Sequence, residues 1–280
     1  MAMRDPLPFT FGIALVPRAL TQNWALIEAL LDLTLTSVRA QTDPDFRVII
    51  ACHDRPRTVM DDDPRLSVLV ADWPVRETGP HNDDSGRKKH ALNDYVLEQG
   101  GGLLMLVDAD DWIDRETVAA ARACIGLGEV GGLITAGMIL DIQSLRIAAL
   151  PHPDIFPGEF HRLCGTSTVA CLRPDSADPV RRDPFSTLRS HHQWLEVAQE
   201  RDVRLARLPI SANYLINTSE NHSDLHGPHL AWRRTLTAAV NAQGRCLGDA
   251  QAACFGIDTT LVSSTWRRFF PPSPDRVITA

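Results

Sequence analysis

The chain has 280 residues, of which 44% are hydrophobic and 22% are charged, so it can bury a full globular core. Its net charge of −7 argues against nucleic-acid binding, and we expect no nucleic-acid partner. The longest apolar runs are strand-length, far short of the roughly 20 residues that a transmembrane span needs, so we expect no such span.

The N-terminal residues and the cysteines predict a cellular compartment. Residues 1–8 lack the basic region and following apolar run of a secretory signal. The six cysteines include no Cys-x-x-Cys pair, so neither a zinc ribbon nor a thioredoxin-type motif is predicted. We therefore expect a cytoplasmic protein whose thiols are reduced.

Strand-like and helix-like patterns alternate through the first half of the chain. The expected strands are 9–16, 46–52, 66–71, 103–107 and 133–140. The expected helices are 23–40, 87–98 and 114–124, the last with Asp114 as its N-cap. This alternation predicts an α/β fold with a mostly parallel central sheet flanked by helices. Ligands bind beyond the carboxyl ends of such strands, so we look for the site there.

The second half of the chain is less regular. It predicts a strand within 163–172, a helix over 191–201 and one or two short strands within 204–215. Helical segments are expected from residue 224 onward. We therefore divide the chain into a domain over 1–223 and a helical C-terminal extension over 224–280. The segment 266–270 (WRRFF) is expected to end a helix packed on the domain, with peripheral membrane contact as the alternative.

An acidic turn follows the most apolar of the expected strands. Asp108, Asp110 and Asp111 place three carboxylates within four positions, and such groups repel one another unless a cation or a helix cap offsets them. A divalent ion with oxygen ligands would do so. An acidic surface turn that caps the next helix is the alternative. An EF-hand is excluded because Ile113 stands where such a loop requires glycine.

Several segments, taken in order, resemble the family-2-like glycosyltransferases of GT-A fold. They are 35–42 (LTSVRAQT), 46–54 (FRVIIACHD), 88–93 (KKHALN), 104–111 (LMLVDADD) and 214–223 (YLINTSENHS). The resemblance covers roughly residues 9–223, and its specificity lies in the order and spacing of the segments. It implies a GT-A fold and hexosyl transfer from a nucleotide-diphosphate sugar to a carbohydrate or other hydroxyl acceptor, as in polysaccharide biosynthesis.

The resemblance also implies roles for individual residues. Asp108 would contact the ribose or a Mg²⁺ or Mn²⁺ ion, Asp110 would be the direct metal ligand, and Asp111 would orient the metal shell. The residues expected to bind the nucleotide are Pro17, Arg18, His53, Asp54, Lys88 and Asp108. His53 stands where the family has a first base-contacting Asp, and for Lys88 a solvated basic helix start is the alternative reading.

The acceptor side departs from the family pattern. Inverting members open a helix in the second half with a Glu-Asp pair that supplies the general base. The matching stretch here begins with His191 and His192, either of which could act as the base, while Asp183 and Glu196 are nearby alternatives. His222 is expected to complete the metal shell, as the corresponding His often does in the family.

Two other functions compete with sugar transfer. A sugar-phosphate nucleotidyltransferase should carry a Gly-rich basic loop after its first strand, and residues 16–20 (VPRAL) contain no glycine. A nucleotide-sugar-binding module that kept the fold and lost turnover is the second competitor, because the Glu-Asp pair is missing.

Overall fold

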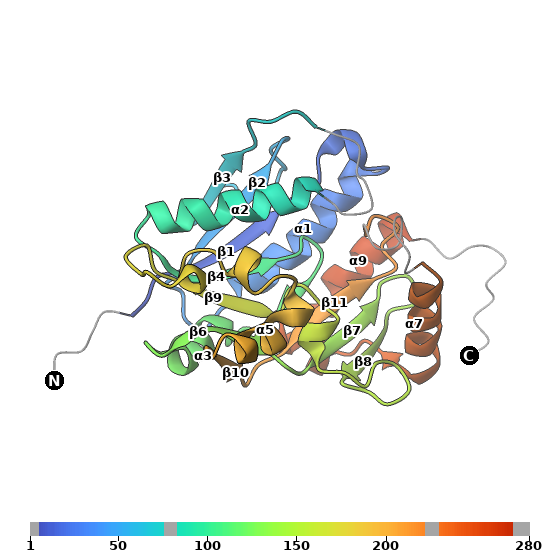
Figure 1. The fold of residues 1–280 in the computed structure, drawn as a ribbon. Helices are drawn as coiled ribbons and strands as arrows, with labels where there is room; N and C mark the ends of the chain where they lie inside the picture. Colours follow the sequence, from blue (N-terminus) through green and yellow to red (C-terminus); the bar gives the residue numbers. More distant parts are fainter. Residues whose placement is uncertain (1–5, 76–82, 222–229, 271–280) are drawn as a thin grey trace.

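The computed structural model describes residues 6–75, 83–221 and 230–270 (Figure 1). Its larger sheet has seven strands, and all of them run parallel except β9, which is antiparallel to both of its neighbours. From edge to edge the strands are β10 (Arg204–Leu208), β6 (Glu129–Ile134), β9 (Thr168–Leu172), β4 (Gly102–Val107), β1 (Phe9–Ala14), β2 (Arg47–Cys52) and β3 (Leu66–Val70). The mostly parallel sheet expected from the sequence is confirmed.

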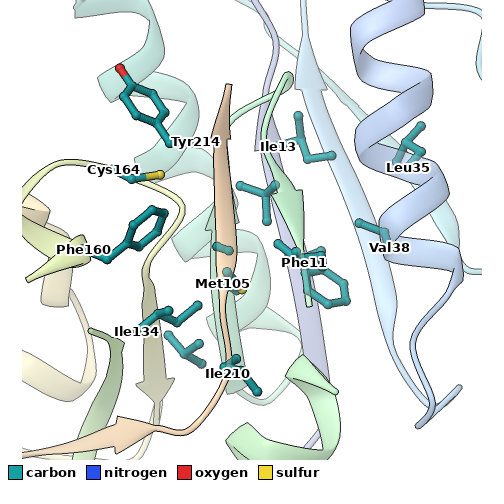
Figure 2. Packing of buried hydrophobic residues seen from close by; sticks show 14 of the residues in the cluster. Phe11, Ile13, Leu35, Val38, Met105, Ile134, Phe160, Cys164, Ile210 and Tyr214 are labelled. Carbon is teal, nitrogen blue, oxygen red and sulfur yellow. The ribbon is translucent and has the colours of Figure 1, made fainter. Parts of the chain in front are cut away.

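Helices α1 (Trp24–Arg39) and α2 (Asp83–Glu98) cover opposite faces of this sheet (Figure 1). Alternate residues of β4 explain why, because side chains along a strand point to opposite faces. Met105 packs in the same cluster as Leu35 and Val38 of α1 (Figure 2), whereas Leu104 packs in the cluster of α2. A strand buried on both faces must be apolar throughout, which is what the sequence shows.

The observed helices otherwise lie close to the expected ranges. Asn23 caps α1 by accepting a hydrogen bond from the Leu26 amide at 3.2 Å, as its residue type favours. Helix α2 begins a turn earlier than expected, with Asp83 and Asp84 in its first turn, where acidic residues complement the helix dipole. The expected helix over 191–201 is a 3-10 turn, η4 (His191–Gln193), that runs into α5 (Trp194–Glu200).

A second, five-stranded sheet was not foreseen. Its strands are β12 (Arg245–Cys246), β8 (Arg146–Leu150), β7 (Gly137–Asp141), β11 (Ala212–Ile216) and β5 (Trp112–Ile113). The expected strand over 133–140 is wrong, because the chain breaks there between β6 and β7. The first half pairs as β6 in the seven-stranded sheet, and the second half pairs as β7 in the five-stranded sheet.

Most of the remaining helical segments lie in the second half of the chain. The segments are η1 (Arg18–Leu20), α3 (Thr117–Cys124), η2 (Phe160–Arg162), η3 (Pro179–Arg181), α4 (Pro184–Thr187), α7 (Leu230–Gln243), α8 (Asp249–Cys254) and α9 (Thr259–Phe269). Helix α9 packs on α1, and the Trp266 indole donates to the Gln143 carbonyl oxygen at 2.9 Å. None of the helices in the described part of the chain is long and apolar enough to cross a membrane.

Asp114 does not cap α3 as expected. The N-cap is Glu116, which makes no side-chain cap hydrogen bond. The Asp114 carboxylate instead accepts hydrogen bonds from the amides of Glu116 at 3.0 Å and Ser211 at 3.2 Å. It therefore joins the acidic turn to the segment before β11, a contact that no local sequence pattern encodes.

Candidate active site

A cleft of about 320 Å³ opens where β1 and β4 end. Its walls come from the loop after β1, both flanking helices, the acidic turn, the segment before β9, η4, β11 and α7. The lining includes Pro17, Lys89, Asp108, Asp110, Gly165, His191, Tyr214, Glu220, Asn221 and Arg233. The cleft lies at the carboxyl ends of parallel strands, where ligands are expected in this class of sheet.

Asp108 and Asp110 both line the cleft, as the sequence predicts for a pair of cation ligands. The Asp108 side chain is 44% exposed, and its Oδ1 lies 3.6 Å from the Lys89 ammonium. The Asp110 Oδ2 accepts a hydrogen bond from the Asn221 side-chain amide at 2.7 Å. Each carboxylate is thus oriented by a neighbour from a distant part of the chain while still facing the cleft.

Asp111 takes a different position from the one expected of a metal ligand. It is fully buried. Its Oδ1 accepts from the Leu215 amide at 2.9 Å, and its Oδ2 accepts from the Thr166 hydroxyl at 2.6 Å and the Cys164 thiol at 3.2 Å. Burial, followed by repulsion from Asp108, raises the pKa of Asp111 to about 7. Asp111 therefore acts as a buried anchor of the turn, because its side chain turns toward β11 and not toward the cleft.

Polar residues of α1 and of the segment just after it also hold the acidic turn. The Thr34 hydroxyl donates to the Ala109 carbonyl oxygen at 2.9 Å, and the Ser37 hydroxyl accepts from the Ile113 amide at 3.2 Å. The Gln41 side chain donates to the Asp114 carbonyl oxygen at 2.7 Å and accepts from the Val118 amide at 3.0 Å. These bonds give a structural reason for polar residues on an otherwise apolar helix end.

Gly165 lets the Asp108 carboxylate lie against the backbone. A Cβ atom at Gly165 would be 2.9 Å from Asp108 Oδ2, closer than real Cβ contacts come. We expect Gly165→Ala to displace this carboxylate and, at the Mn²⁺-dependent nucleotide site that the resemblance implies here, to weaken nucleotide binding about tenfold, as small misplacements at a site do. Isothermal titration would measure it. Gly86→Ala is the matched control, because a Cβ there meets no atom within 4 Å. Equal affinities for both variants would contradict the prediction.

Lys88 does not face the cleft, contrary to the role expected for it. Its side chain is fully buried, and its ammonium donates to the Leu15 carbonyl oxygen at 2.7 Å and to Asp84 Oδ2 at 2.5 Å. Burial lowers the pKa of Lys88, an effect that Asp84 opposes. The next residue, Lys89, lines the cleft instead. One step along a helix turns a side chain by about 100 degrees, and the sequence alone does not say which lysine faces inward.

The two lysines should therefore respond differently to substitution. Lys88→Met would remove the buried ammonium that pairs with Asp84 Oδ2 and the Leu15 carbonyl oxygen, although Asp84 Oδ1 keeps its bond from the Trp73 indole. We therefore expect a stability loss of about 3 kcal/mol. Lys89→Met removes a partly exposed charge, so stability should change by less than about 1 kcal/mol while nucleotide affinity falls. Urea denaturation of both variants measures the difference. Equal losses of stability would show that Lys88 contributes no more to the fold than Lys89 does.

The residues expected to contact the nucleotide lie at the ends of β1 and β2. Pro17 lines the cleft. The Arg18 backbone amide donates to Asp54 Oδ2 at 2.9 Å, which joins the two strand ends, while the Arg18 side chain is exposed. The His53 Nε2 lies 2.9 Å from the Trp73 carbonyl oxygen, and its ring packs edge-on against the Trp73 ring. Arg18, His53 and Asp54 are thus beside the cleft and not among its lining residues.

The two expected base candidates separate in the structure. His191 lines the cleft, and its Nδ1 lies 2.6 Å from the His161 carbonyl oxygen. Because a carbonyl only accepts, Nδ1 carries the proton and Nε2 is left as the acceptor. Burial lowers the pKa of His191 to about 4, so the ring is neutral at physiological pH. His192 is exposed and outside the cleft lining.

The alternatives named for these roles are placed elsewhere. The Asp183 carboxylate caps α4 by accepting from the Ser186 amide at 3.0 Å. The Glu196 carboxylate pairs with the Arg162 guanidinium. Neither lines the cleft. His222, the expected metal ligand, lies outside the described residues.

Sequence reasoning missed several cleft residues. Glu220 accepts from the amides of Asn23 at 2.7 Å and Gln22 at 3.3 Å, so it ties the segment after β11 to the start of α1. Tyr214 of β11 and Arg233 of α7 also line the cleft. The resemblance covered Tyr214 without assigning it a role. Arg233 lies in a helix that the sequence treated as an extension, and no local pattern marks it.

No protein-family model and no curated protein matches the sequence. Among solved structures, the chain is similar to S. aureus TarS at 14% identity and a TM-score of 0.41, over 95% of this chain and 44% of TarS. It is similar to the galactosyltransferase LgtC, solved with donor and acceptor sugar analogues, at 11% identity and a TM-score of 0.40, over 88% of this chain and 100% of LgtC. It is also similar to 4-diphosphocytidyl-2C-methyl-D-erythritol synthase at 12% identity and a TM-score of 0.40, over 82% of this chain and 99% of the synthase.

This chain spans less than half the length of TarS. The geometry of the cleft, and not these likenesses, supports the function proposed next.

Proposed function

We propose that this protein transfers a sugar from a nucleotide-diphosphate sugar to a hydroxyl acceptor, with Mg²⁺ or Mn²⁺ held by Asp108 and Asp110. The observation that carries the proposal is the placement of these two carboxylates, both facing a cleft at the carboxyl end of the buried strand β4. Like charges gathered at a ligand-binding edge of the sheet are stabilised by a bound cation.

The residues present fit a metal that is shared with the substrate. The described residues contain no group of three or more His, Cys, Asp and Glu side chains that could hold an ion. The described residues therefore do not supply a full set of protein ligands to an ion. Mg²⁺ is commonly bound by one or two carboxylates together with substrate phosphates, which is the arrangement that Asp108 and Asp110 allow. When bound, the ion would supply charge stabilisation for the departing diphosphate.

The chain's own residues would position the two substrates. Lys89 lies on the same wall as the acidic pair and can approach a diphosphate oxygen. In the reaction the acceptor oxygen bonds to the anomeric carbon, the bond from that carbon to the diphosphate breaks with its electron pair going to the diphosphate, and the acceptor proton passes to solvent water. His191 can accept a hydrogen bond from the acceptor hydroxyl through Nε2. Its pKa of about 4 makes it a weak base, so we assign it to positioning.

A thermal-shift panel of nucleoside diphosphates and nucleotide sugars, with and without Mn²⁺, tests this function. A ligand that binds only the native state raises the unfolding midpoint. At a ligand concentration of about 100 times its Kd, the native state gains roughly 2.7 kcal/mol of stability. We expect one nucleotide to stabilise the protein only with Mn²⁺, and its sugar conjugate to be consumed when a hydroxyl acceptor is present. Stabilisation by a nucleoside triphosphate with a sugar phosphate would indicate a nucleotidyltransferase, and binding without turnover would indicate an inactive module.

A further inference from the structure

Arg233 is a cleft-lining cation that forms no ion pair with any carboxylate in the described part of the chain. It comes from the first turns of α7, and its Nη1 donates to the Tyr214 hydroxyl. Within the described ranges Arg233 forms no ion pair, and its buried Nε has no hydrogen-bond partner there. Lys89, the lysine of the lining, differs because Asp108 lies 3.6 Å from its ammonium. The positive charge of Arg233 is therefore not offset by any described carboxylate.

Two aromatic rings hold the guanidinium in place. Its Cζ lies 5.1 Å from the centroid of the Tyr214 ring and 5.4 Å from that of the Trp232 ring. Cation–π contacts of this kind orient a guanidinium plane without neutralising its charge. A half-buried charge without an ion pair among the described residues is costly, and an arriving oxyanion would recover that cost through charge-assisted hydrogen bonds. The oriented guanidinium of Arg233 is thus suited to bind an anionic group.

The position of Arg233 separates it from the nucleotide side of the cleft. Helix α7 packs on β7 and β8 of the second sheet, whereas β2, β3 and α2 lie on the other side of the molecule (Figure 1). The Tyr214 ring lies on the side of Cys164 and away from Ile13 of β1 (Figure 2). A donor whose nucleotide lies at the ends of β1 and β2, with its diphosphate at Asp110, leaves the Tyr214 and Arg233 wall for the acceptor.

We propose that Arg233, held by Tyr214 and Trp232, binds a phosphate or carboxylate group of the acceptor, so that the acceptor is an anionic hydroxyl compound. The identification of this bound compound as the acceptor rests on the proposed function. The oxyanion site itself rests only on the geometry of Arg233.

The test compares oxyanions with neutral compounds on the full chain. Glycerol phosphate, glucuronate and inorganic phosphate are titrated by calorimetry beside glycerol and glucose, using the wild type, Arg233→Gln and Arg234→Gln. Arg234 is the matched control because it is the next residue of the same helix, is exposed and is outside the cleft lining. We expect at least one oxyanion to bind about tenfold more weakly to Arg233→Gln, as loss of a charge-assisted contact predicts. The neutral compounds and Arg234→Gln should show no such change.

Three outcomes would overturn the proposal. One is that no oxyanion binds the wild type more tightly than Arg233→Gln. Another is that Arg234→Gln causes the same loss. The third is that Arg233→Gln weakens Mn²⁺-dependent nucleoside diphosphate binding while oxyanion binding, measured with that nucleotide bound, is unchanged, which would assign Arg233 to the donor. Arg233→Lys keeps the positive charge and should retain part of the oxyanion affinity. This intermediate affinity would show that the loss in Arg233→Gln comes from the missing charge and not from a folding defect.

Failure of the proposed function gives a different result. In that case no nucleotide would stabilise the protein with Mn²⁺ in the wild type. Oxyanion binding at Arg233 needs no nucleotide and is judged by its own titration.

Discussion

Replacing Asp110 by Asn is expected to abolish the Mn²⁺-dependent stabilisation by nucleotide while the fold stays intact. The change removes one of the two charges proposed to hold the ion and leaves the side-chain size almost unchanged. The Asn carbonyl oxygen can still accept the bond that Asn221 donates at 2.7 Å to Asp110 Oδ2. Losing an anionic ligand from a site with two carboxylates should weaken metal-dependent binding by about 100-fold, and turnover with it.

Thermal shift and calorimetry with Mn²⁺ and the nucleotide selected by the panel measure this effect. Asp62→Asn is the matched control, because Asp62 is exposed and is not among the residues that line the cleft. Both variants should unfold at the wild-type midpoint in the absence of ligand. If Asp110→Asn keeps full Mn²⁺-dependent binding, Asp110 does not belong to the site and the proposed function loses its main support.

Replacing Asp111 by Ala is expected to cause the largest loss of stability. Three donors would lose their acceptor in a fully buried place, namely the Leu215 amide, the Thr166 hydroxyl and the Cys164 thiol. Buried polar groups without partners cost about 1–3 kcal/mol each, so we expect a loss of about 3 kcal/mol or more in the free energy of unfolding. Asp111→Asn should lose less, because its carbonyl oxygen keeps one acceptor. Urea denaturation measures both, and near-wild-type stability of the Ala variant would contradict the assigned role.

The pH dependence of stability gives a second test of Asp111. Burial raises its pKa to about 7, so the native state keeps a proton that the unfolded state has released. Its contribution to stability therefore falls as pH rises from about 4 to 7, by an amount on the order of 4 kcal/mol. Burial lowers the pKa of His191 to about 4, so below its ordinary pKa of about 6.5 only the unfolded state gains a proton. The His191 contribution is lost as pH falls through that window, which is the opposite sign.

These opposed effects should be separable by substitution. In Asp111→Asn the His191 effect is unopposed, so the stability of this variant should rise from about pH 4.5 to 6.5 more steeply than that of the wild type. His191→Gln should show the reverse, with stability falling over the same range. Urea denaturation of the three proteins across that range is the measurement. Parallel profiles for Asp111→Asn and the wild type would show that Asp111 titrates normally.

Part of the site followed from the sequence because local patterns encode it. Asp108 and Asp110 come directly after an apolar run that had to be a buried strand, and a parallel sheet fixes the edge at which such a strand ends. The strands β1, β2 and β4 and the helix α1 were predictable for the same reason, since their periodicity depends only on neighbouring residues. Asn23 could likewise be placed at the start of its helix.

Other features required contacts that neighbouring residues do not determine. Asp110 and Asp111 are adjacent in the same turn, but their side chains point in different directions. The direction of the Asp111 side chain is set by Thr166, Cys164 and Leu215 from distant segments. Lys88 and Lys89 are adjacent and identical in type, yet one is buried against Asp84 and the other faces the cleft.

The sequence by itself determined the alternation of strands and helices and the edge of the sheet at which a ligand would bind. Only the tertiary structure decided which of the clustered charges face the cleft, and only it brought Tyr214 and Arg233 to the same cleft. The physical reason is that periodicity records whether a residue is buried. The direction and partner of a buried polar group depend instead on chain segments far apart in sequence, which meet only after folding.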